Sequence, residues 1–267
     1  MRPALSSASE RSTAIVRYDG SSAAELATLL GLPRVVVFDE VGSTLDIAHA
    51  LGEEGAEAGT LIVADAQSAG RGRMGRVWRS DPGAGIWLTL LERPAADESL
   101  GVLALRLALA LAPALDAFSA HSVQVKWPND LYVEGRKLAG VLIEARWHGA
   151  RLDWLAVGAG INVRVPEGLD VAGLTDGTER GAVLRAVVPV LRAAVGAAGL
   201  LREEELARFA ARDIAAGQPC TAPVHGIVAG IDRAGSLLVD TAAGRTIWRA
   251  GSLTLAPLGD HSLGDRA

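Results

Sequence analysis

Hydrophobic and polar positions alternate with two different periods along the chain, which predicts a fold of mixed strands and helices. Short runs rich in Val, Ile and Leu between turn residues are typical of strands, whereas apolar residues three and four positions apart are typical of helices. The expected strands are RVVVF (34–38), TLIVAD (60–65), GIWLTLL (85–91), SVQVKW (122–127), KLAGVLIEARW (137–147) and RLDWLAVGAGINV (151–163). Because only His148-Gly149-Ala150 separates the last two, we expect an antiparallel hairpin and therefore a mixed main sheet.

Helices are expected where the apolar period lengthens and a capping residue precedes it. The expected helices are 21–31, which Gly31 ends, 43–55, which Ser43 or Thr44 caps, and two later segments at about 179–198 and 202–213. Segment 98–118 is apolar on nearly all sides, so it should be buried, and Pro113 should kink it or start a new turn.

The pattern divides the chain into three parts. Residues 1–33 are expected to form a leader with one short helix and no helix-turn-helix, and residues 34–213 to form an α/β catalytic domain. After Gly217, short strands alternate with Gly and Asp turns, so residues 214–267 are expected to form a small β-barrel.

Composition narrows the possible classes of protein. The 267 residues are 49% hydrophobic and carry a formal net charge of −5, which indicates a globular chain and disfavours nucleic acid as the main partner. The sequence lacks a signal peptide and an apolar segment long enough to cross a membrane. Cys220 is the only cysteine, so a cytoplasmic protein without disulfides is expected; the thiol is either a small buried side chain or a nucleophile.

The segment QSAGRGRMGRVW (67–78) concentrates positive charge in this acidic chain. Three of its arginines alternate with glycines directly after an expected strand, a position typical of ligand-binding loops. Glycines let backbone N–H groups approach an anion, and we expect Gly72 to need a positive φ. An ordered anion-binding loop is the favoured interpretation, beside a segment that touches RNA and a mobile surface loop with incidental charges.

Four further motifs each allow a functional and a purely structural interpretation. KWPND (126–130) presents a lysine, an amide and a possible Mg²⁺ ligand, or is a strand-ending turn with a core Trp. Lys137 needs an anionic partner, or lies along the core surface with its ammonium in solvent. GAGIN (158–162) leaves one strand face bare for a flat ring, or forms a bulge. GST (42–44) is an ordinary helix cap unless its hydroxyls face a polar ligand.

The order of these five motifs, between about Val37 and Val163, closely resembles that of the biotin protein ligases, in a short form without a DNA-binding domain. The resemblance implies the class II synthetase-like fold of the biotin–lipoate ligases with a C-terminal SH3-like barrel. It implies that biotin, ATP and Mg²⁺ give biotinyl-5′-AMP, and that biotin then passes to a lysine of a biotin carboxyl carrier protein. A lipoate–protein ligase or octanoyl transferase is the alternative. Neither DNA nor a membrane is an expected partner, and the chain should be a monomer or a homodimer through the main sheet.

The resemblance also implies roles for individual residues. Biotin would contact Ser43, Thr44, Leu45, Gln67, Gly70, Arg71, Gly72, Arg73, Lys137 and Gly140. ATP would contact Arg73, Trp78, Asn129, Asp130, Lys137, Gly158, Gly160 and Asn162. Lys137, Arg71 and Arg73 would be catalytic, Asp130 would bind Mg²⁺, and the arginine loop would become ordered over the intermediate. Leu45 is a departure, because many family members carry Asn at this position.

Overall fold

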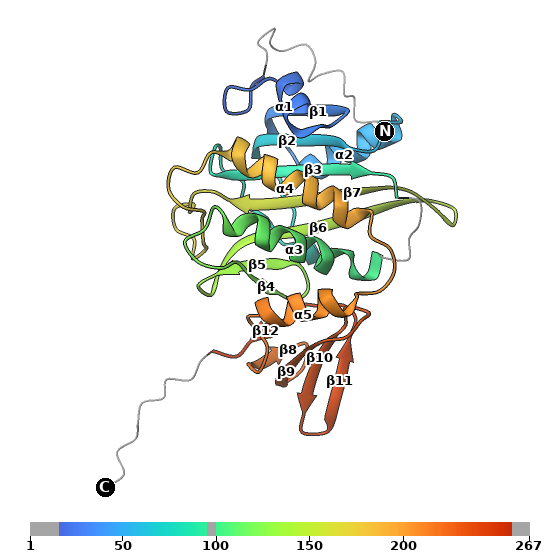
Figure 1. Cartoon of the computed structure of the whole chain (residues 1–267), viewed down its shortest axis with the longest axis vertical. Helices are drawn as coiled ribbons and strands as arrows, with labels where there is room; N and C mark the ends of the chain where they lie inside the picture. The colour runs from blue at the N-terminus through green and yellow to red at the C-terminus, as the bar shows by residue number, and fades with distance from the viewer. Residues whose placement is uncertain (1–15, 95–99, 258–267) are drawn as a thin grey trace.

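The computed structural model describes residues 16–94 and 100–257, which form a large mixed sheet, a smaller antiparallel sheet and flanking helices (Figure 1). The large sheet contains, in spatial order, β1 (Arg34–Val41), β2 (Thr60–Gln67), β3 (Gly85–Glu92), β7 (Arg151–Asn162), β6 (Arg136–His148), β5 (Asp130–Val133) and β4 (Gln124–Lys126). Strands β1 and β2 are parallel and every other neighbouring pair is antiparallel. The expected mixed sheet is therefore confirmed.

Burial explains which strands lie at the centre of the sheet. Every residue of β3 is buried, and β7 is buried over most of its length, as their nearly continuous apolar sequences predict. The expected hairpin is present, with β6 and β7 joined at Gly149, which has a φ of 60°. Strand β5 was not expected: the turn foreseen at Asn129-Asp130 ends at Asn129, and Asp130 already pairs with Lys126 of β4.

The helices lie close to their expected positions. Their bounds are α1 (Ala23–Leu30), α2 (Thr44–Glu53), α3 (Leu100–Asp116), α4 (Arg180–Val195) and α5 (Glu203–Arg212). Ser22 caps α1 in a reciprocal pair with Glu25, and Ser43 caps α2 by accepting a hydrogen bond from the Leu45 amide. Helix α3 continues through Pro113, and positions 98 and 99 of the expected segment lie outside the described residues.

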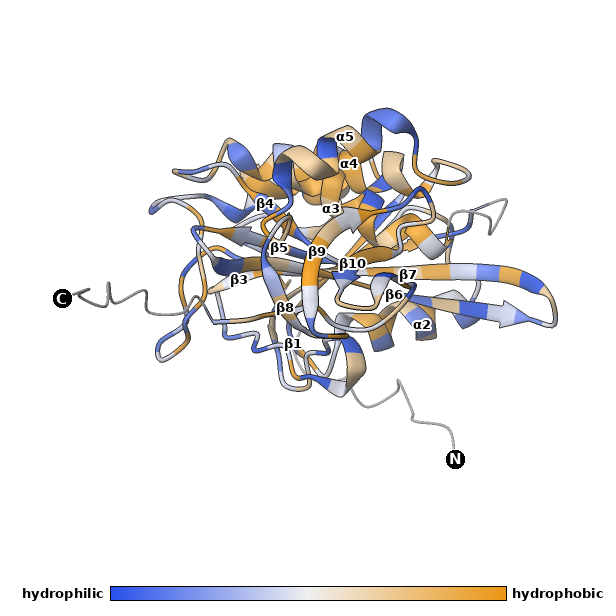
Figure 2. Ribbon diagram, turned by 90° about the horizontal axis from the view of Figure 1, so that it is seen from below, coloured by the Kyte–Doolittle hydropathy of each residue, from blue (hydrophilic) through white to orange (hydrophobic). Residues whose placement is uncertain are grey.

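Two apolar layers hold the large sheet. Helices α3 and α4 pack on one face, whereas α2 lies on the opposite face (Figure 2). Helix α1 contacts α4 and shares the main core with α3, α4 and the strands. Leu45 and Ala48 of α2 pack there against Ile62 and Ala156. Strands β6 and β7 carry Gly140, Gly158 and Gly160 in their sequences, and this opens room on the α2 face beside the helix N-terminus.

The smaller sheet follows α5 in the chain and lies near the β4 edge of the large sheet (Figure 1). Its spatial order is β11 (Gly244–Trp248), β10 (Leu237–Thr241), β9 (Gly226–Ile231), β8 (Pro219–Ala222) and β12 (Thr254–Leu255). Trp127 joins the two sheets, because its buried Nε1 donates to the Gly235 carbonyl at 2.9 Å. Cys220 is buried in this part, and burial raises the pKa of its thiol, as suits a small core side chain. Among the described helices, none is both long and apolar enough to span a membrane.

A buried ion pair connects α3 to α5. The Arg106 Nε atom donates to Glu205 at 2.7 Å, and both side chains are at most 5% exposed. Burial alone would raise the pKa of Glu205, but the hydrogen bonds from Arg106 and from the Arg202 backbone outweigh it and lower this pKa to about 2. The stabilisation from this carboxylate is therefore present at neutral pH and is lost as the pH falls toward 2.

We expect Arg106→Met to lower the free energy of unfolding by about 3–5 kcal/mol, because Glu205 would remain buried without its partner. Equilibrium urea unfolding measures this change. The matched control is Arg245→Met, which removes the exposed ion pair with Asp240 and should leave the midpoint of urea unfolding unchanged. Equal shifts in the two variants would contradict the assignment of a structural role to the buried pair.

Candidate active site

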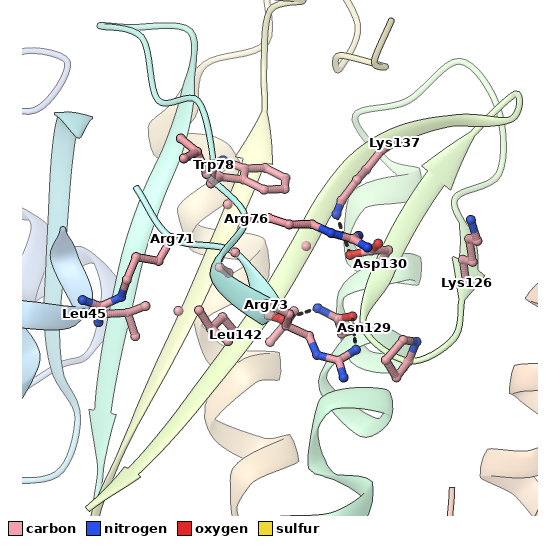
Figure 3. Close-up of a pocket in the computed structure, with 18 of the residues that line it drawn as sticks. Leu45, Arg71, Arg73, Arg76, Trp78, Lys126, Asn129, Asp130, Lys137 and Leu142 are labelled. Carbon is pink, nitrogen blue, oxygen red and sulfur yellow. Dashed lines mark hydrogen bonds and ion pairs between the residues drawn. The ribbon is translucent and has the colours of Figure 1, made fainter. Parts of the chain in front are cut away.

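A cavity of about 180 Å³ lies on the α2 face of the large sheet, beneath the arginine–glycine segment 67–78 (Figure 3). It is lined by residues of helix α2, of strands β2, β5, β6 and β7, and of the C-terminal segment 249–253 between β11 and β12. Fourteen of the expected site residues line it: Ser43, Thr44, Leu45, Gln67, Arg71, Gly72, Arg73, Trp78, Asn129, Asp130, Lys137, Gly140, Gly158 and Gly160. Segments far apart in sequence therefore meet at one place.

Two of the expected residues do not line the cavity. Gly70 forms the base of the loop, where a Cβ atom would lie 2.3 Å from the Trp78 carbonyl oxygen. Asn162 is buried, and its Nδ2 donates to the carbonyls of Lys137 and Ala172. The Asn162 amide is therefore used to hold the end of β7 against its neighbours.

One end of the cavity combines a polar network with an apolar wall. The Gln67 Oε1 atom accepts from the Thr44 backbone amide at 2.9 Å and from the Thr44 hydroxyl at 3.2 Å. Leu45 is 4% exposed and lies 3.3 Å from the position that a Gly158 Cβ would occupy. With Leu88 and Leu142 also in the lining, this end suits a compact ligand that is mostly apolar.

The loop departs from its expected backbone conformation. Gly72 has a φ of −113°, so the positive φ expected there is wrong. The left-handed residues are Met74, with a φ of 56°, and Gly75, with a φ of 73°, at the end of a short 3-10 turn Arg73–Gly75. The reversal that brings the loop back toward Trp78 therefore lies two residues later than expected.

Arg73 and Arg76 extend from the loop toward the C-terminal segment. The Arg73 guanidinium donates to Asn129 Oδ1 at 3.1 Å and to the Gly251 carbonyl at 3.2 Å. Arg76 donates to the Ser252 hydroxyl at 3.3 Å. Burial lowers the pKa of Arg73, and its direct partners are uncharged, so its positive charge remains available to a ligand.

Three more charged or polar groups surround Asp130. Lys137 Nζ lies 2.7 Å from Asp130 Oδ1 and 5.0 Å from the centre of the Trp78 ring. Burial lowers the pKa of Lys126, and the nearby positive charges of Lys137 and Arg76 lower it further against the effect of Asp130. Burial, with the Asp130 charge, raises the pKa of Tyr132 to about 12. The site is therefore strongly cationic, although the chain is acidic.

The site assignments made from the sequence left out several lining residues, among them the polar side chains of Arg76, Lys126, Tyr132 and Ser252. Arg76 and Lys126 lie inside the motifs that drew attention, so their positive charge was a usable signal. Tyr132 follows from strand β5, which was itself missed. Ser252 had no signal, because its place beside the loop depends on how the smaller sheet docks.

A glycine surface on β6 and β7 is covered by Trp78. Gly140 and Gly160 are paired across the two strands, and a Cβ on Gly160 would lie 2.5 Å from the Trp78 ring. The expected bare face of GAGIN therefore holds a flat ring, and that ring is the protein's own indole. Trp78 Nε1 is buried and has no hydrogen-bond partner among the described residues.

The site offers few carboxylates to a metal ion. Asp130 is the one acidic residue in the described lining, and no cluster of three or more metal-binding side chains occurs within residues 16–94 and 100–257. Mg²⁺ commonly uses one or two carboxylates and takes its remaining ligands from phosphates and water. The donor set therefore fits a metal ion that arrives with a phosphate ligand.

The family model described as the biotin/lipoate A/B protein ligase family matches residues 38–162, which contain most of the cavity lining. The bifunctional ligase/repressor BirA of Bacillus spizizenii is 41% identical over 126 residues, which are 47% of this chain and 39% of that protein. This chain thus spans about two fifths of that relative's length.

Two further comparisons extend over most of both chains. The biotin–[acetyl-CoA-carboxylase] ligase of Paracoccus denitrificans is 33% identical over 218 residues, which cover 72% of this chain and 89% of that protein. The structure of the biotin protein ligase of Aquifex aeolicus in complex with biotin and ATP superimposes with a TM-score of 0.69 at 28% identity, over 83% of this chain and 98% of that chain. This chain therefore belongs to the biotin/lipoate A/B protein ligase family.

Proposed function

We propose that this protein activates biotin with ATP to biotinyl-5′-AMP and transfers the biotinyl group to a lysine of a biotin carboxyl carrier protein. The relatives named for biotin ligation and the related structure with biotin and ATP support this activity. We also propose that the acceptor is a biotin carboxyl carrier protein, that the protein is cytoplasmic and that it does not bind DNA. The buried free thiol of Cys220 suits a reducing compartment.

The observation that carries the proposal is the pairing of an apolar end with a cationic end in one cavity. Four cations and one carboxylate line the described cavity beside Arg71, whose charge is paired with Asp46 and Glu144: Arg73, Arg76, Lys126, Lys137 and Asp130. A biotin carboxylate and a triphosphate repel each other, so bringing them within reach of reaction requires compensating positive charge. The geometry supplies that charge next to a compact apolar pocket.

The two ends of the cavity suggest how the substrates divide between them. The ring system of biotin would lie beside Leu45 and Leu142, with polar contacts from the Thr44–Gln67 network. The nucleotide would lie over Gly140 and Gly160, where Trp78 can move aside or stack on the adenine, whereas Gly158, expected to contact ATP, lies beside Leu45 at the apolar end. The Leu45 side chain provides only apolar contact, so it cannot make the polar contact of the Asn that many family members carry at this position.

The reaction uses these residues to hold charge rather than to form bonds with the substrates. A biotin carboxylate oxygen attacks the α-phosphorus of ATP and forms a bond to it. The bond between the α-phosphorus and the oxygen that bridges to the β-phosphate breaks, and pyrophosphate leaves with that electron pair. Arg73 and Lys137 would stabilise the charge on the α-phosphate oxygens. A neutral lysine amine then attacks the acyl carbon, AMP leaves, and the amine loses one proton.

Mg²⁺ would be held by Asp130 and by phosphate oxygens, and it would add charge compensation for the triphosphate. The Lys137–Asp130 contact of 2.7 Å keeps that carboxylate turned toward the cavity. The arginine loop would cover the intermediate and exclude water, because water hydrolyses a mixed anhydride. Ordering of this loop by the ligands is part of the proposal.

We expect pyrophosphate release with ATP and biotin, and label from biotin on an added carrier domain. Parallel reactions with lipoate should give background release only. Measuring pyrophosphate and acceptor label in both reactions separates the two substrates. Pyrophosphate release with lipoate but not with biotin would overturn the choice of biotin. Pyrophosphate release without label on the carrier domain would overturn the choice of acceptor.

Lys137→Ala and Arg73→Ala should each reduce adenylation by about 10²–10³-fold, because each removes charge that acts on the reacting phosphate. Single-turnover formation of biotinyl-5′-AMP measures the step. Arg79→Ala is the matched control, since Arg79 is exposed, pairs with Asp81 and lies outside the cavity. Rates near that of the unmodified protein for both Lys137→Ala and Arg73→Ala would remove these residues from the chemistry.

Gly70→Ala should reduce adenylation by about tenfold or more, because its Cβ would collide with the Trp78 carbonyl oxygen and displace the loop. Gly72→Ala is the control within the same loop: its Cβ would be 3.3 Å from the nearest atom, and φ is −113°. Adenylation rates together with thermal unfolding separate loop displacement from general instability. Equal losses in the two variants would contradict this account of Gly70.

A further inference from the structure

Arg71 differs from the other loop arginines in where its charge is directed. Its side chain runs toward Leu45, away from Lys137 and Asp130 (Figure 3). One terminal nitrogen of the guanidinium donates to Asp46 of α2, and the other donates to both oxygens of Glu144 on β6 at 3.0 and 3.2 Å. Arg71 thus connects the loop to two elements of the fold at the apolar end of the cavity.

A second pair of side chains supports Glu144 from behind. The Trp154 Nε1 atom can only donate, so its 3.2 Å contact makes His49 Nδ1 an acceptor. The proton of the neutral ring is therefore on His49 Nε2, which donates to Glu144 Oε2 at 2.8 Å. A continuous chain of hydrogen bonds runs from Trp154 through His49 and Glu144 to Arg71, and it fixes the carboxylate that the loop arginine meets.

The local charges separate Arg71 from Arg73. Two carboxylates face one guanidinium at Arg71, so its charge is already compensated by the protein. Burial opposes the charged form of Arg71, but Asp46 and Glu144 outweigh it and raise the pKa. Arg73 instead donates to the neutral oxygens of Asn129 and Gly251. An incoming anion therefore gains more from Arg73, because attraction to Arg71 is offset by repulsion from Asp46 and Glu144.

We propose that Arg71 is a positioning residue that fixes the beginning of the arginine loop to α2 and β6 through Asp46 and Glu144, and that it does not contact the reacting anions. This inference rests on the proposed function for its link to catalysis. The attachment holds the start of the loop, while Arg73, two residues later, is carried over the cavity. Glu144, His49 and Trp154 then belong to the support of the loop, although they do not touch the substrates.

Limited trypsin digestion of the ligand-free protein tests the attachment without using activity. Glu144→Gln keeps every loop arginine as a cleavage site and removes one of the two negative charges that Arg71 meets, while Asp46 remains. We expect loop cleavage about five- to tenfold faster than in the unmodified protein, since a partly buried charge pair is weakened. Glu53→Gln is the matched control, because Glu53 pairs with Arg146 on the same face and has no hydrogen bond to the loop. Equal cleavage rates in all three proteins would overturn the proposal.

A double-mutant cycle tests the role in the reaction. Arg71→Met, Glu144→Gln and the double variant should each raise the KM for biotin and ATP by about tenfold, with kcat for adenylation changed far less. The double variant should be no worse than Arg71→Met alone, because both changes remove one interaction. A fall in kcat for Arg71→Met as large as that for Arg73→Ala, with Glu144→Gln unaffected, would make Arg71 an anion ligand and overturn the proposal.

The two experiments keep this inference separate from the proposed function. If the unmodified protein fails to release pyrophosphate with biotin and ATP, the proposed function is wrong, and the trypsin assay still decides whether Arg71 fixes the loop. If the unmodified protein is active but Glu144→Gln changes neither cleavage nor KM, the proposed attachment is wrong and the proposed function remains.

Discussion

The crowding of positive charges around the single carboxylate of Asp130 is the constraint on which the rest of the site depends. Lys126, Lys137 and Arg76 repel one another, and the pKa of Lys126 is lowered by that repulsion as well as by burial. The strand register holds them together: Lys126 is opposite Asp130, and Asp130 is opposite Gly140. A slip of one residue would turn these side chains to the other face of the sheet, so a stable fold is what makes an unfavourable charge cluster possible.

The smaller sheet takes part in this arrangement although it lies beside the main domain. Gly251 and Ser252 accept hydrogen bonds from Arg73 and Arg76, so the position of the smaller sheet determines where these guanidinium groups lie. The buried hydrogen bond from Trp127 to Gly235 is one of the contacts that hold the smaller sheet there. Trp127 is therefore the core Trp that the structural interpretation of KWPND predicted, while its neighbours in the same motif face the cavity. One short motif thus has both a structural and a chemical role.

The sequence predicted the large strands and helices well, because long apolar runs and capping residues are local signals. It also identified most of the cavity lining, because glycine and charge were concentrated in a few motifs. Contacts across the chain were not predictable in this way. Arg71 meets Glu144 across 73 positions, and Trp78 covers Gly160, only because the sheet order brings β2, β6 and β7 together. Strand β5 was missed because four residues are too few to show a period.

The arginine loop shows why counting charges in a motif does not give the charge that a ligand meets. Arg71 and Arg73 are two residues apart, and composition treats them alike. Asp46 and Glu144 compensate the first, whereas the second has neutral partners. The alternation of glycine with arginine lets adjacent side chains point to different elements, one toward α2 and β6 and the other toward Asn129. A loop built in this way can be fixed by charged partners at one end and keep uncompensated charge for a ligand at the other, and these are the properties that a lid over a water-sensitive intermediate requires.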